Sequence, residues 1–318
     1  MDKIVVLDGF TANPGDISWD CFKKLGELTV YKRTPDNLVV ERAKGARIAI
    51  TNKTVFSKEI IEALPELEYI GVIATGYNVV DIEAAGRQGI VVTNVPGYST
   101  ESVVQTVFAH LLNLTQRVAQ HSESVRAGDW VRSDDFCYWS GELVELSGKT
   151  FGIMGFGAIG QRVAAVASAL GMRVICYSRT ASKIDAAGYE AVNLEKLFAE
   201  SDVLSLNCPL TAANAEVVNA ENLKLMKSSA FLINTARGGL VNEADLAAAL
   251  DSGILAGAGV DVLSTEPPQA DNPLLEAKNC YITPHLAWAT LEARQRLLRT
   301  AYQNVESFQK GLTVNRVN

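Results

Sequence analysis

Clusters of basic residues are absent from this chain of 318 residues, which carries a formal net charge of −7 and has a pI near 5.2. Without a positive field, we expect no binding to nucleic acid or to an anionic membrane surface. A site for an anionic substrate must instead be built from a few placed cations and backbone amides.

Long apolar runs are absent too: no segment is long enough to span a membrane, and the N-terminus lacks the basic region and apolar stretch of a signal peptide. Paired cysteines are missing as well, because the five are scattered, odd in number and form no C-x-x-C pair: Cys21, Cys137, Cys176, Cys208 and Cys280. This pattern indicates free thiols and no metal site. We therefore expect a mature cytoplasmic protein.

The most informative motif that is present is a glycine turn. A short apolar strand beginning at Phe151 runs into Gly155-x-Gly157-x-x-Gly160, a helical pattern follows, and a second strand covers residues 174–177. Gly155 can make the tight turn, Gly157 lets the backbone approach a pyrophosphate, and Gly160 lets the helix pack close to the strand. The motif predicts a dinucleotide site in a β-α-β unit, with a purely structural turn or another nucleotide fold as the alternative.

Strand-like runs alternate with helical patterns along the whole chain, which is typical of an α/β protein with parallel sheets. The first part predicts strands at 4–7, 47–51, 69–74 and 90–93, with helices at 57–63 and 81–87. One long helix is expected from about residue 99 to 126, followed by a polar, aromatic loop. Later strands are expected at 203–206, 230–234, 257–262 and 281–283, and a last helix at 290–310. We expect this helix to return to the N-terminal unit, which is short for an independent domain.

Only three histidines are present, and their positions differ in kind. His110 lies among apolar residues of the long helix, which favours a core role, and His121 lies at its polar end, which favours a solvated one. His285 directly follows a predicted strand and Pro284, at the edge where ligands of open α/β sheets bind. It is therefore a candidate for catalysis, with capping or packing as the alternative.

Arg237 and Glu266 follow other predicted strands in the same way, in Asn234-Thr-Ala-Arg-Gly-Gly239 and Asp261-Val-Leu-Ser-Thr-Glu-Pro-Pro268. Taken singly, the arginine is equally consistent with a surface ion pair and the glutamate with a solvated loop. Together with His285 they form a coherent set. A carboxylate beside an imidazole orients a general acid–base, and an arginine can grip a substrate carboxylate with two parallel hydrogen bonds.

With these residues in place, the chain resembles the D-isomer-specific 2-hydroxyacid dehydrogenases over essentially its full length, and especially the glycerate dehydrogenases and hydroxypyruvate/glyoxylate reductases. The motifs that carry the resemblance are Ala74-Thr-Gly-Tyr-Asn-Val-Val-Asp81, the glycine turn, Asn234-Thr-Ala-Arg-Gly-Gly-Leu-Val-Asn-Glu243, Gly259-Val-Asp-Val262 with Glu266-Pro267, and Thr283-Pro-His285. Formate dehydrogenases of this superfamily have glutamine where Glu266 stands, so that branch is disfavoured.

The resemblance implies two Rossmann-like domains with parallel sheets. A flavodoxin-like substrate domain, residues 1–98 with 287–318, would contain an inserted NAD(P)-binding domain, residues 99–286. Arg237, Glu266 and His285 would be catalytic, with the backbone amides of Thr75 and Gly76 at the substrate carboxylate. Trp288, which closely follows His285, is a separate candidate for the wall of the substrate pocket, with simple packing as the alternative. The implied cofactor contacts are Gly155, Phe156, Gly157, Ala158, Ile159, Gly160, Cys208, Pro209, Thr235, Ala236 and, at the carboxamide end, Asp261.

The sequence departs from the family's NAD enzymes after the second strand of the glycine-turn unit. Those enzymes usually carry an acidic residue there for the adenosine ribose, whereas this chain reads Tyr177-Ser178-Arg179-Thr180. No carboxylate repels a 2′-phosphate, and all three residues after the tyrosine can bind one. We predict that NADP is used at least as well as NAD, with an exposed Arg179 and a retained NAD preference as the alternative.

The expected reaction is hydride transfer between the nicotinamide and a small 2-keto or 2-hydroxy acid, with hydroxypyruvate or glyoxylate as the preferred hypothesis. A bulkier D-2-hydroxy acid and a non-catalytic, NAD-binding corepressor-like scaffold are the alternatives, while a methyltransferase would leave the three catalytic candidates without a role. By the same resemblance we expect a homodimer. Its aromatic loop, with Phe136, Tyr138 and Trp139, would reach the neighbouring site, with simple packing of these side chains as the alternative.

Overall fold

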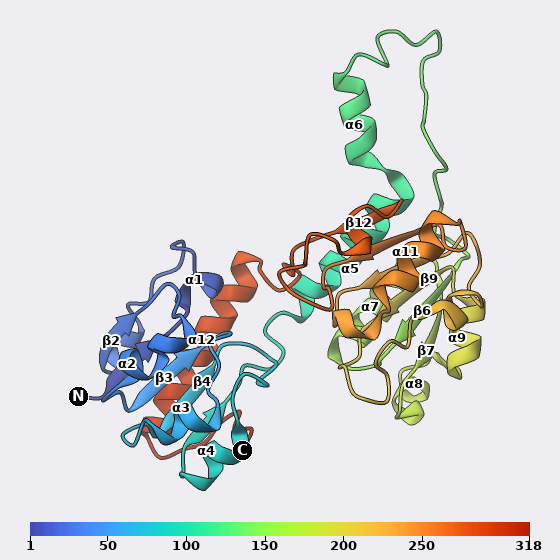
Figure 1. Cartoon of the computed structure of the whole chain (residues 1–318). Helices are drawn as coiled ribbons and strands as arrows, with labels where there is room; N and C mark the ends of the chain where they lie inside the picture. Colours follow the sequence, from blue (N-terminus) through green and yellow to red (C-terminus); the bar gives the residue numbers. More distant parts are fainter. The chain divides into compact units, whose positions relative to one another are not determined.

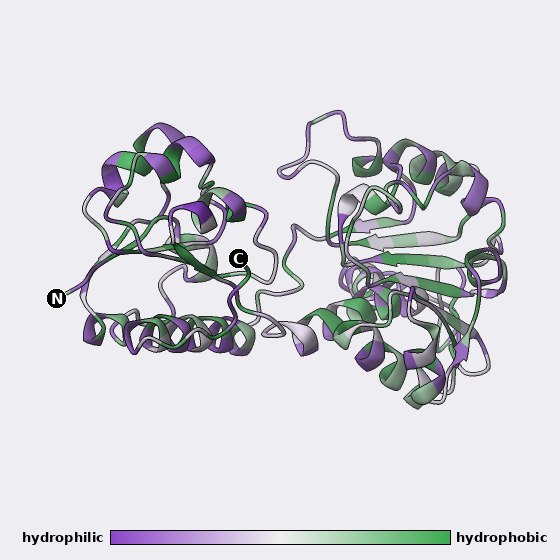
Figure 2. Ribbon diagram, turned by 90° about the horizontal axis from the view of Figure 1, so that it is seen from below, coloured by the Kyte–Doolittle hydropathy of each residue, from purple (hydrophilic) through white to green (hydrophobic).

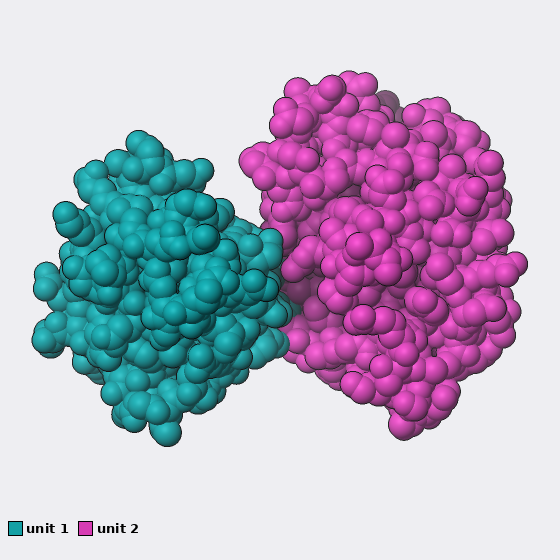
Figure 3. All heavy atoms as spheres, turned by 60° about the horizontal axis from the view of Figure 1, so that its bottom comes forward, with its two compact units in different colours: residues 1–99, 288–318 teal, residues 100–287 magenta.

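The computed structural model describes residues 1–318 and divides into two compact units, Met1–Ser99 with Trp288–Asn318, and Thr100–Ala287 (Figure 3). These junctions lie one residue later than the predicted domain boundaries. Both units are built around a parallel sheet, so the expected fold class of two parallel-sheet α/β domains is confirmed. No helix combines the length and the apolar character that crossing a membrane requires.

The first unit contains a five-stranded sheet in the order β2-β1-β3-β4-β5, which is the flavodoxin-like order. Its strands are β1 Lys3–Val6, β2 Glu27–Val30, β3 Ile48–Thr51, β4 Tyr69–Val72 and β5 Val91–Thr93. Its helices are α1 Gly9–Ala12, α2 Val39–Ala43, α3 Lys58–Glu62, α4 Ile82–Arg87 and α12 Leu291–Gln309. Strand β2 is missing from the predicted set because its residues are half-exposed and polar in part, as expected of an edge strand.

Helices cover both faces of this sheet (Figure 2). Side chains of its strands alternate between the two faces, so each face has its own core. Ile4 and Val6 of β1 belong to the cluster that contains α12, whereas Val5 belongs to the cluster that contains α2, α3 and α4. Helix α12 buries Ala293, Leu297, Ala301 and Val305 there. The last helix thus completes the first unit.

The second unit contains a seven-stranded parallel sheet in the order β12-β11-β10-β9-β6-β7-β8. Its strands are β6 Thr150–Met154, β7 Arg173–Tyr177, β8 Glu190–Ala191, β9 Val203–Leu206, β10 Phe231–Asn234, β11 Gly257–Val260 and β12 Cys280–Ile282. Its helices are α5 Thr100–Gln116, α6 Val118–Arg126, α7 Ala158–Ala169, α8 Ala181–Ala186, α9 Leu194–Glu200, α10 Ala220–Leu223 and α11 Glu243–Asp251. Strand order reverses between β6 and β9, which is where nucleotides bind in such sheets.

The single long helix predicted from residue 99 to 126 is wrong, because two helices meet at Arg117. Helix α5 ends at Gln116, and Arg117 adopts a left-handed conformation with φ 49° before α6 begins. Helix α5 buries one apolar face as far as Leu114, whereas α6 buries none of its residues. Burial therefore does not hold α6 along the direction of α5, and Figure 1 shows α6 projecting away from the sheet of its unit.

Candidate active site

The glycine turn connects β6 to α7 and has the geometry that its three glycines permit. Gly155 has φ +100°, and a Cβ there would lie 2.7 Å from the backbone of Asn207. A Cβ on Gly160 would lie 2.1 Å from the carbonyl oxygen of Gly155, so the start of α7 packs directly on the turn. A Cβ on Gly157, by contrast, would meet nothing within 4 Å. Two glycines are required by packing, and the third leaves space open.

The other predicted cofactor residues lie where neighbouring strands end, at one edge of the sheet that we call the carboxyl edge. Ser178 to Thr180 follow β7, Cys208 and Pro209 follow β9, and Thr235 and Ala236 follow β10. Phe156 of the turn is buried and packs edge-on against Tyr189, while Ala158 and Ile159 begin α7.

Two buried polar atoms at this edge lack any hydrogen-bond partner, the Thr235 hydroxyl and the Asn207 side-chain oxygen. Buried polar atoms nearly always have a hydrogen-bond partner in folded proteins. Two such atoms without a partner, beside an open glycine turn, therefore indicate a place for a polar ligand. The arrangement fits a dinucleotide. Asn207 was missed in the sequence, although its position directly before Cys208 at the end of β9 was a usable signal.

Arg179 is exposed, and Ser178 accepts a hydrogen bond from the Thr180 amide at 3.4 Å. Burial raises the pKa of the Cys208 thiol, while a backbone hydrogen bond, the Asn214 side chain and the charge of Arg179 oppose this shift. One cation and two hydroxyls, not a carboxylate, follow β7.

The three catalytic candidates follow β10, β11 and β12, which are neighbours in the sheet. The structure brings two of them into contact: Glu266 Oε2 lies 2.6 Å from His285 Nδ1, and Glu266 Oε1 accepts a hydrogen bond from the Leu263 amide at 3.0 Å. Both side chains are about one third exposed, at 36% and 32%. The imidazole is therefore oriented by the carboxylate, with its Nε2 atom left for chemistry.

Arg237 is exposed and forms no ion pair within the chain, so the surface-salt-bridge alternative has no counterpart in the structure. Its guanidinium donates only to the neighbouring Ala236 carbonyl, at 2.7 Å. The three catalytic candidates thus follow three neighbouring strands of one sheet.

Asp261, a predicted cofactor contact, is only 1% exposed, and its carboxylate accepts three hydrogen bonds from the chain itself. The donors are the Thr283 hydroxyl and the amides of Leu286 and Ala287. The structure therefore shows a structural role for Asp261, and contact with the cofactor stays a prediction.

The other two histidines have different surroundings. His110 is buried, and its Nε2 lies 3.0 Å from the Thr283 hydroxyl, so it is a hydrogen-bonded core histidine as expected. The expectation of a solvated His121 is wrong in part, because it is half-buried. Its Nδ1 lies 2.9 Å from the Arg117 carbonyl, and its Nε2 accepts from the Ser140 amide at 3.1 Å. It ties the start of α6 to the returning segment, which sequence periodicity does not show.

The predicted substrate residues of the first unit are Thr75 and Gly76, which follow β4, and Trp288, which precedes α12. The Thr75 hydroxyl donates to Val95, and the Thr75 carbonyl accepts from Asn94, whereas the backbone amides of Thr75 and Gly76 donate to no group of the chain. Trp288 packs against Tyr98 with ring centroids 6.5 Å apart and is half-buried beside the α12 core. The amides are available to an anion, while a pocket-lining role for Trp288 stays a prediction.

All five cysteines are free thiols, and burial raises the pKa of Cys176 and Cys280 to about 12. No group of three or more His, Cys, Asp or Glu side chains is arranged to hold a metal ion.

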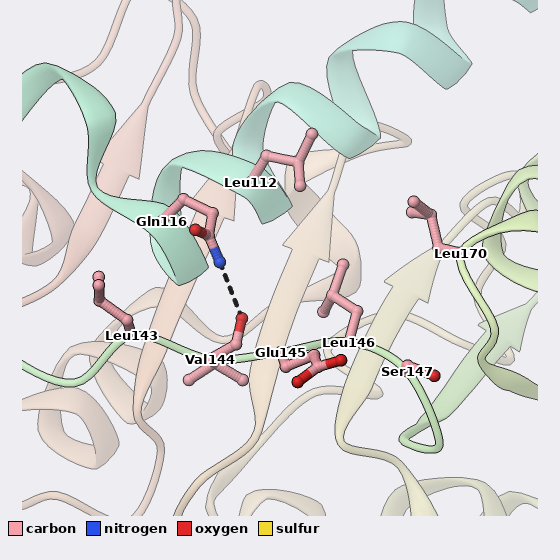
Figure 4. A pocket seen from close by; sticks show the side chains of 8 residues that line it. All are labelled: Leu112, Gln116, Leu143, Val144, Glu145, Leu146, Ser147 and Leu170. Atoms are coloured by element: carbon pink, nitrogen blue, oxygen red, sulfur yellow. Dashed lines mark hydrogen bonds between the residues drawn. The ribbon is translucent and has the colours of Figure 1, made fainter.

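A surface hollow lies beside the end of α5 (Figure 4). The Gln116 amide donates to the Val144 carbonyl at 3.0 Å across its floor, and exposed Leu112, Leu143 and Leu170 contribute apolar side chains. It adjoins the arm, which we define as α6 together with residues 127–143. The arm carries exposed large apolar residues, namely Val118, Val125, Trp130, Val131, Phe136, Trp139 and Leu143.

Comparison with known proteins agrees with this geometry. The family described as D-isomer specific 2-hydroxyacid dehydrogenase, NAD binding domain, matches residues 108–287. The chain is 46% identical to a hydroxypyruvate reductase of Blautia hydrogenotrophica, over 99% of both chains. It is 42% identical to a glycerate dehydrogenase of Methylorubrum extorquens, over 89% of this chain and 88% of that one.

A solved structure of an acyclic imino acid reductase in complex with NADPH and D-Arg has a TM-score of 0.86 and 32% identity, over 99% of this chain and 100% of that one. The fold, the glycine turn and the strand-end residues described above are thus accompanied by sequence identity along almost the entire chain. The protein belongs to the D-isomer specific 2-hydroxyacid dehydrogenase family.

Proposed function

We propose that this family member reduces hydroxypyruvate or glyoxylate with NADPH, or oxidises D-glycerate or glycolate in reverse. The observation that carries the proposal is the Glu266–His285 pair, with Arg237 following a strand of the same sheet. These groups lie at the carboxyl edge that also carries the glycine turn. The nicotinamide, when bound, donates or accepts the hydride.

His285 acts as the general acid in reduction. With its Nδ1 proton held by Glu266, the imidazolium donates its Nε2 proton to the keto oxygen, and the neutral ring takes a proton from the hydroxyl in the reverse direction. Glu266 orients the ring and balances its charge. Arg237 binds the substrate carboxylate through two parallel hydrogen bonds, and the amides of Thr75 and Gly76 add further donors.

A small substrate is supported by the names of the two relatives above, hydroxypyruvate reductase and glycerate dehydrogenase. Steady-state kinetics with hydroxypyruvate, glyoxylate, pyruvate and a bulky 2-keto acid test it. We expect the highest kcat/KM for the first two and a loss of about 100-fold or more in His285→Ala. Good turnover of the bulky acid alone would overturn the substrate assignment. Equal, negligible rates in both proteins would favour the non-catalytic scaffold.

A preference for NADP is supported by Ser178, Arg179 and Thr180, which follow β7 where a carboxylate would repel the 2′-phosphate. The solved relative with bound NADPH is consistent with it. We expect kcat/KM for NADPH to equal or exceed that for NADH. Arg179→Ala should lower kcat/KM for NADPH by about tenfold, the size expected for the loss of one charge-assisted contact. The kcat/KM for NADH should stay within about twofold of the wild-type value. A strong NADH preference that Arg179→Ala does not change would exclude the idea.

A homodimer through the arm is the third part of the proposal. Val131 and Phe136 are 89% and 88% exposed, and apolar groups in such numbers on one segment mark an association surface. Val131→Asp and Phe136→Asp should shift sedimentation from dimer to monomer, while Val55→Asp, at an exposed position of the first unit, should not. A monomeric wild type would contradict the proposal.

We further propose that Phe136, Tyr138 and Trp139 of one protomer complete the substrate site of the other. In that case Trp139→Ala raises the KM for the keto acid at concentrations where the variant is still dimeric. A monomeric variant with wild-type KM would show that these residues serve no second site.

A further inference from the structure

A polar chain of hydrogen bonds, buried at His110 and Asp261 and half-buried at Thr283, lies beside the segment that carries His285. His110 Nε2, in α5, lies 3.0 Å from the Thr283 hydroxyl, and that hydroxyl donates to Asp261 Oδ1 at 2.6 Å. The carboxylate also accepts hydrogen bonds from the Leu286 and Ala287 amides, both at 2.9 Å. We call His110, Thr283 and Asp261 the relay. It connects helix α5 with the residues on either side of the catalytic candidate.

The direction of the hydrogen bonds in the relay follows from the chemistry of its members. The single proton of the Thr283 hydroxyl is used in the hydrogen bond to the carboxylate, so the hydroxyl oxygen accepts the hydrogen bond from His110 Nε2. Burial lowers the pKa of His110, although the charge of Asp261 opposes this shift, so the ring is neutral at neutral pH and carries its proton on Nε2. Each donor in the relay thus meets one acceptor.

The neighbouring strand is shaped to admit this ring. A Cβ on Gly259 of β11 would lie 2.6 Å from His110 Cβ and 2.8 Å from its Nδ1. An apolar side chain could fill the same space without a partner, whereas a buried imidazole needs one. The histidine at this position, opposite Gly259 and hydrogen-bonded to a hydroxyl, therefore has a polar role in addition to filling space.

The segment held by the relay is unusual in its backbone. His285 has φ +51°, a left-handed conformation that non-glycine residues rarely adopt. Its amide donates to the Asp261 carbonyl at 2.8 Å, and the next two amides donate to the Asp261 carboxylate. A second contact from α5 is made by the Ser102 hydroxyl, which donates to the Ala287 carbonyl at 2.5 Å. The segment is held from one side by Asp261 and α5.

We propose that His110 and Thr283 are positioning residues for His285. They fix the Asp261 carboxylate in the rotamer that holds residues 285–287, and so keep the imidazole facing Glu266. The inference rests on the proposed function for the role of His285, but its structural half does not depend on turnover.

The test combines kinetics with NMR of the three histidines. Thr283→Val removes the hydroxyl at constant shape, and Thr283→Ser keeps it. His110→Phe removes the donor, and His110→Gln keeps an N–H near the Nε2 position. The control is Thr115→Val, because Thr115 is a buried threonine of α5 whose hydroxyl bonds Leu111 instead. Two-bond 1H–15N spectra of 15N-histidine-labelled protein report the tautomer and environment of each ring.

In Thr283→Val and His110→Phe we expect the His285 ring signals to move from their wild-type positions. The kcat should fall by about 10- to 100-fold with little change in the KM of the keto acid, because the imidazole is misplaced while Arg237 is not. Thr283→Ser and His110→Gln should restore both signals and rate to near wild type. Thr115→Val should match wild type in both measurements.

Wild-type His285 signals in Thr283→Val would overturn the inference. A loss of kcat in Thr283→Ser equal to that in Thr283→Val would also overturn it. So would a loss of kcat in Thr115→Val of the same size, since either result would indicate a nonspecific effect on packing. If the wild type turns over no keto acid, the proposed function fails, and the NMR comparison alone decides whether the relay positions His285.

Discussion

At the scale of single residues, the Glu266–His285 pair is short but open to water, with side chains 36% and 32% exposed. Ion pairs that remain exposed contribute little to folding, because water screens them and the side chains lose freedom. The pair is therefore expected to matter for orientation of the imidazole and not for stability.

Replacement of the carboxylate tests this separation. Glu266→Gln should lower kcat by about 100-fold, because a neutral amide neither balances the imidazolium nor enforces the tautomer. Its free energy of unfolding should stay within about 0.5 kcal/mol of the wild-type value. Steady-state kinetics and urea unfolding measure the two. A variant with normal kcat would show that Glu266 does not orient the ring.

His110 predicts a dependence of stability on pH. Its pKa in the folded protein lies below 6.5, chiefly because of burial, so below that pH the unfolded chain binds a proton that the folded chain does not. The stabilising contribution of neutral His110 is therefore fully present above the pKa of the unfolded state, and it is lost as the pH falls from there through the folded pKa. The free energy of unfolding should therefore decrease from pH 7 toward pH 5.

His110→Gln isolates this contribution. The pH slope should become shallower by at most about 1.4 kcal/mol per pH unit, the limit for one proton. Urea unfolding at several pH values measures it, and Thr115→Val, which removes no titratable group, should keep the wild-type slope. An unchanged slope in His110→Gln would mean that His110 does not enter the linkage.

At the scale of elements, the β6–α7 turn separates two roles of glycine. Gly160 has no room for a Cβ, whereas Gly157 has extended backbone with φ −82° and open space in front of it. Alanine at the second position is compatible with the fold, but its methyl group would occupy the space into which a pyrophosphate is expected to come.

Alanine should therefore impair cofactor binding at position 157 and stability at position 160. Gly157→Ala should bind NADPH at least about tenfold more weakly while its stability stays within about 0.5 kcal/mol of wild type. Gly160→Ala should lose about 1–3 kcal/mol through overpacking. Fluorescence titration and urea unfolding measure the two properties. Normal NADPH affinity in Gly157→Ala would place the phosphates elsewhere.

Elements with a strong local pattern were predicted well, while those that depend on what they pack against were not. Strand 203–206 matches β9 in full, and the last helix differs from α12 by one residue at each end. No glycine or proline lies near Arg117 that would predict the break between α5 and α6 from the sequence. It follows from the absence of any burial for α6, which is a property of the surroundings and not of residues 99–126 themselves.

At the scale of the whole molecule, the chain leaves the first unit at Ser99 and returns at Trp288. The stability of the first unit thus depends on residues nearly 200 positions away from its last strand, because α12 covers one face of its sheet. Leu297 of α12 is fully buried in that cluster.

Leu297→Ala should destabilise the first unit by about 2–5 kcal/mol through lost burial and the cavity left behind. Trp19 and Trp288 pack at the α12 core of this unit, whereas Trp130 and Trp139 of the second unit are exposed. The first unit therefore contributes the packed tryptophans whose fluorescence changes during urea unfolding. Leu312→Ala, at an exposed position of the same C-terminal segment, should have little effect. Equal stability of the two variants would show that α12 contributes less than its burial indicates.

The sequence by itself determined the parallel α/β class, the glycine turn and the strand-end positions of Arg237, Glu266 and His285. These depend on periodicity and spacing within short segments. Only the tertiary structure decided that Glu266 contacts Nδ1 of His285, that Arg117 ends α5, and that His110 meets Thr283, 173 residues further along the chain. Such contacts depend on which faces of distant elements are buried together, and no local pattern of residues contains that information.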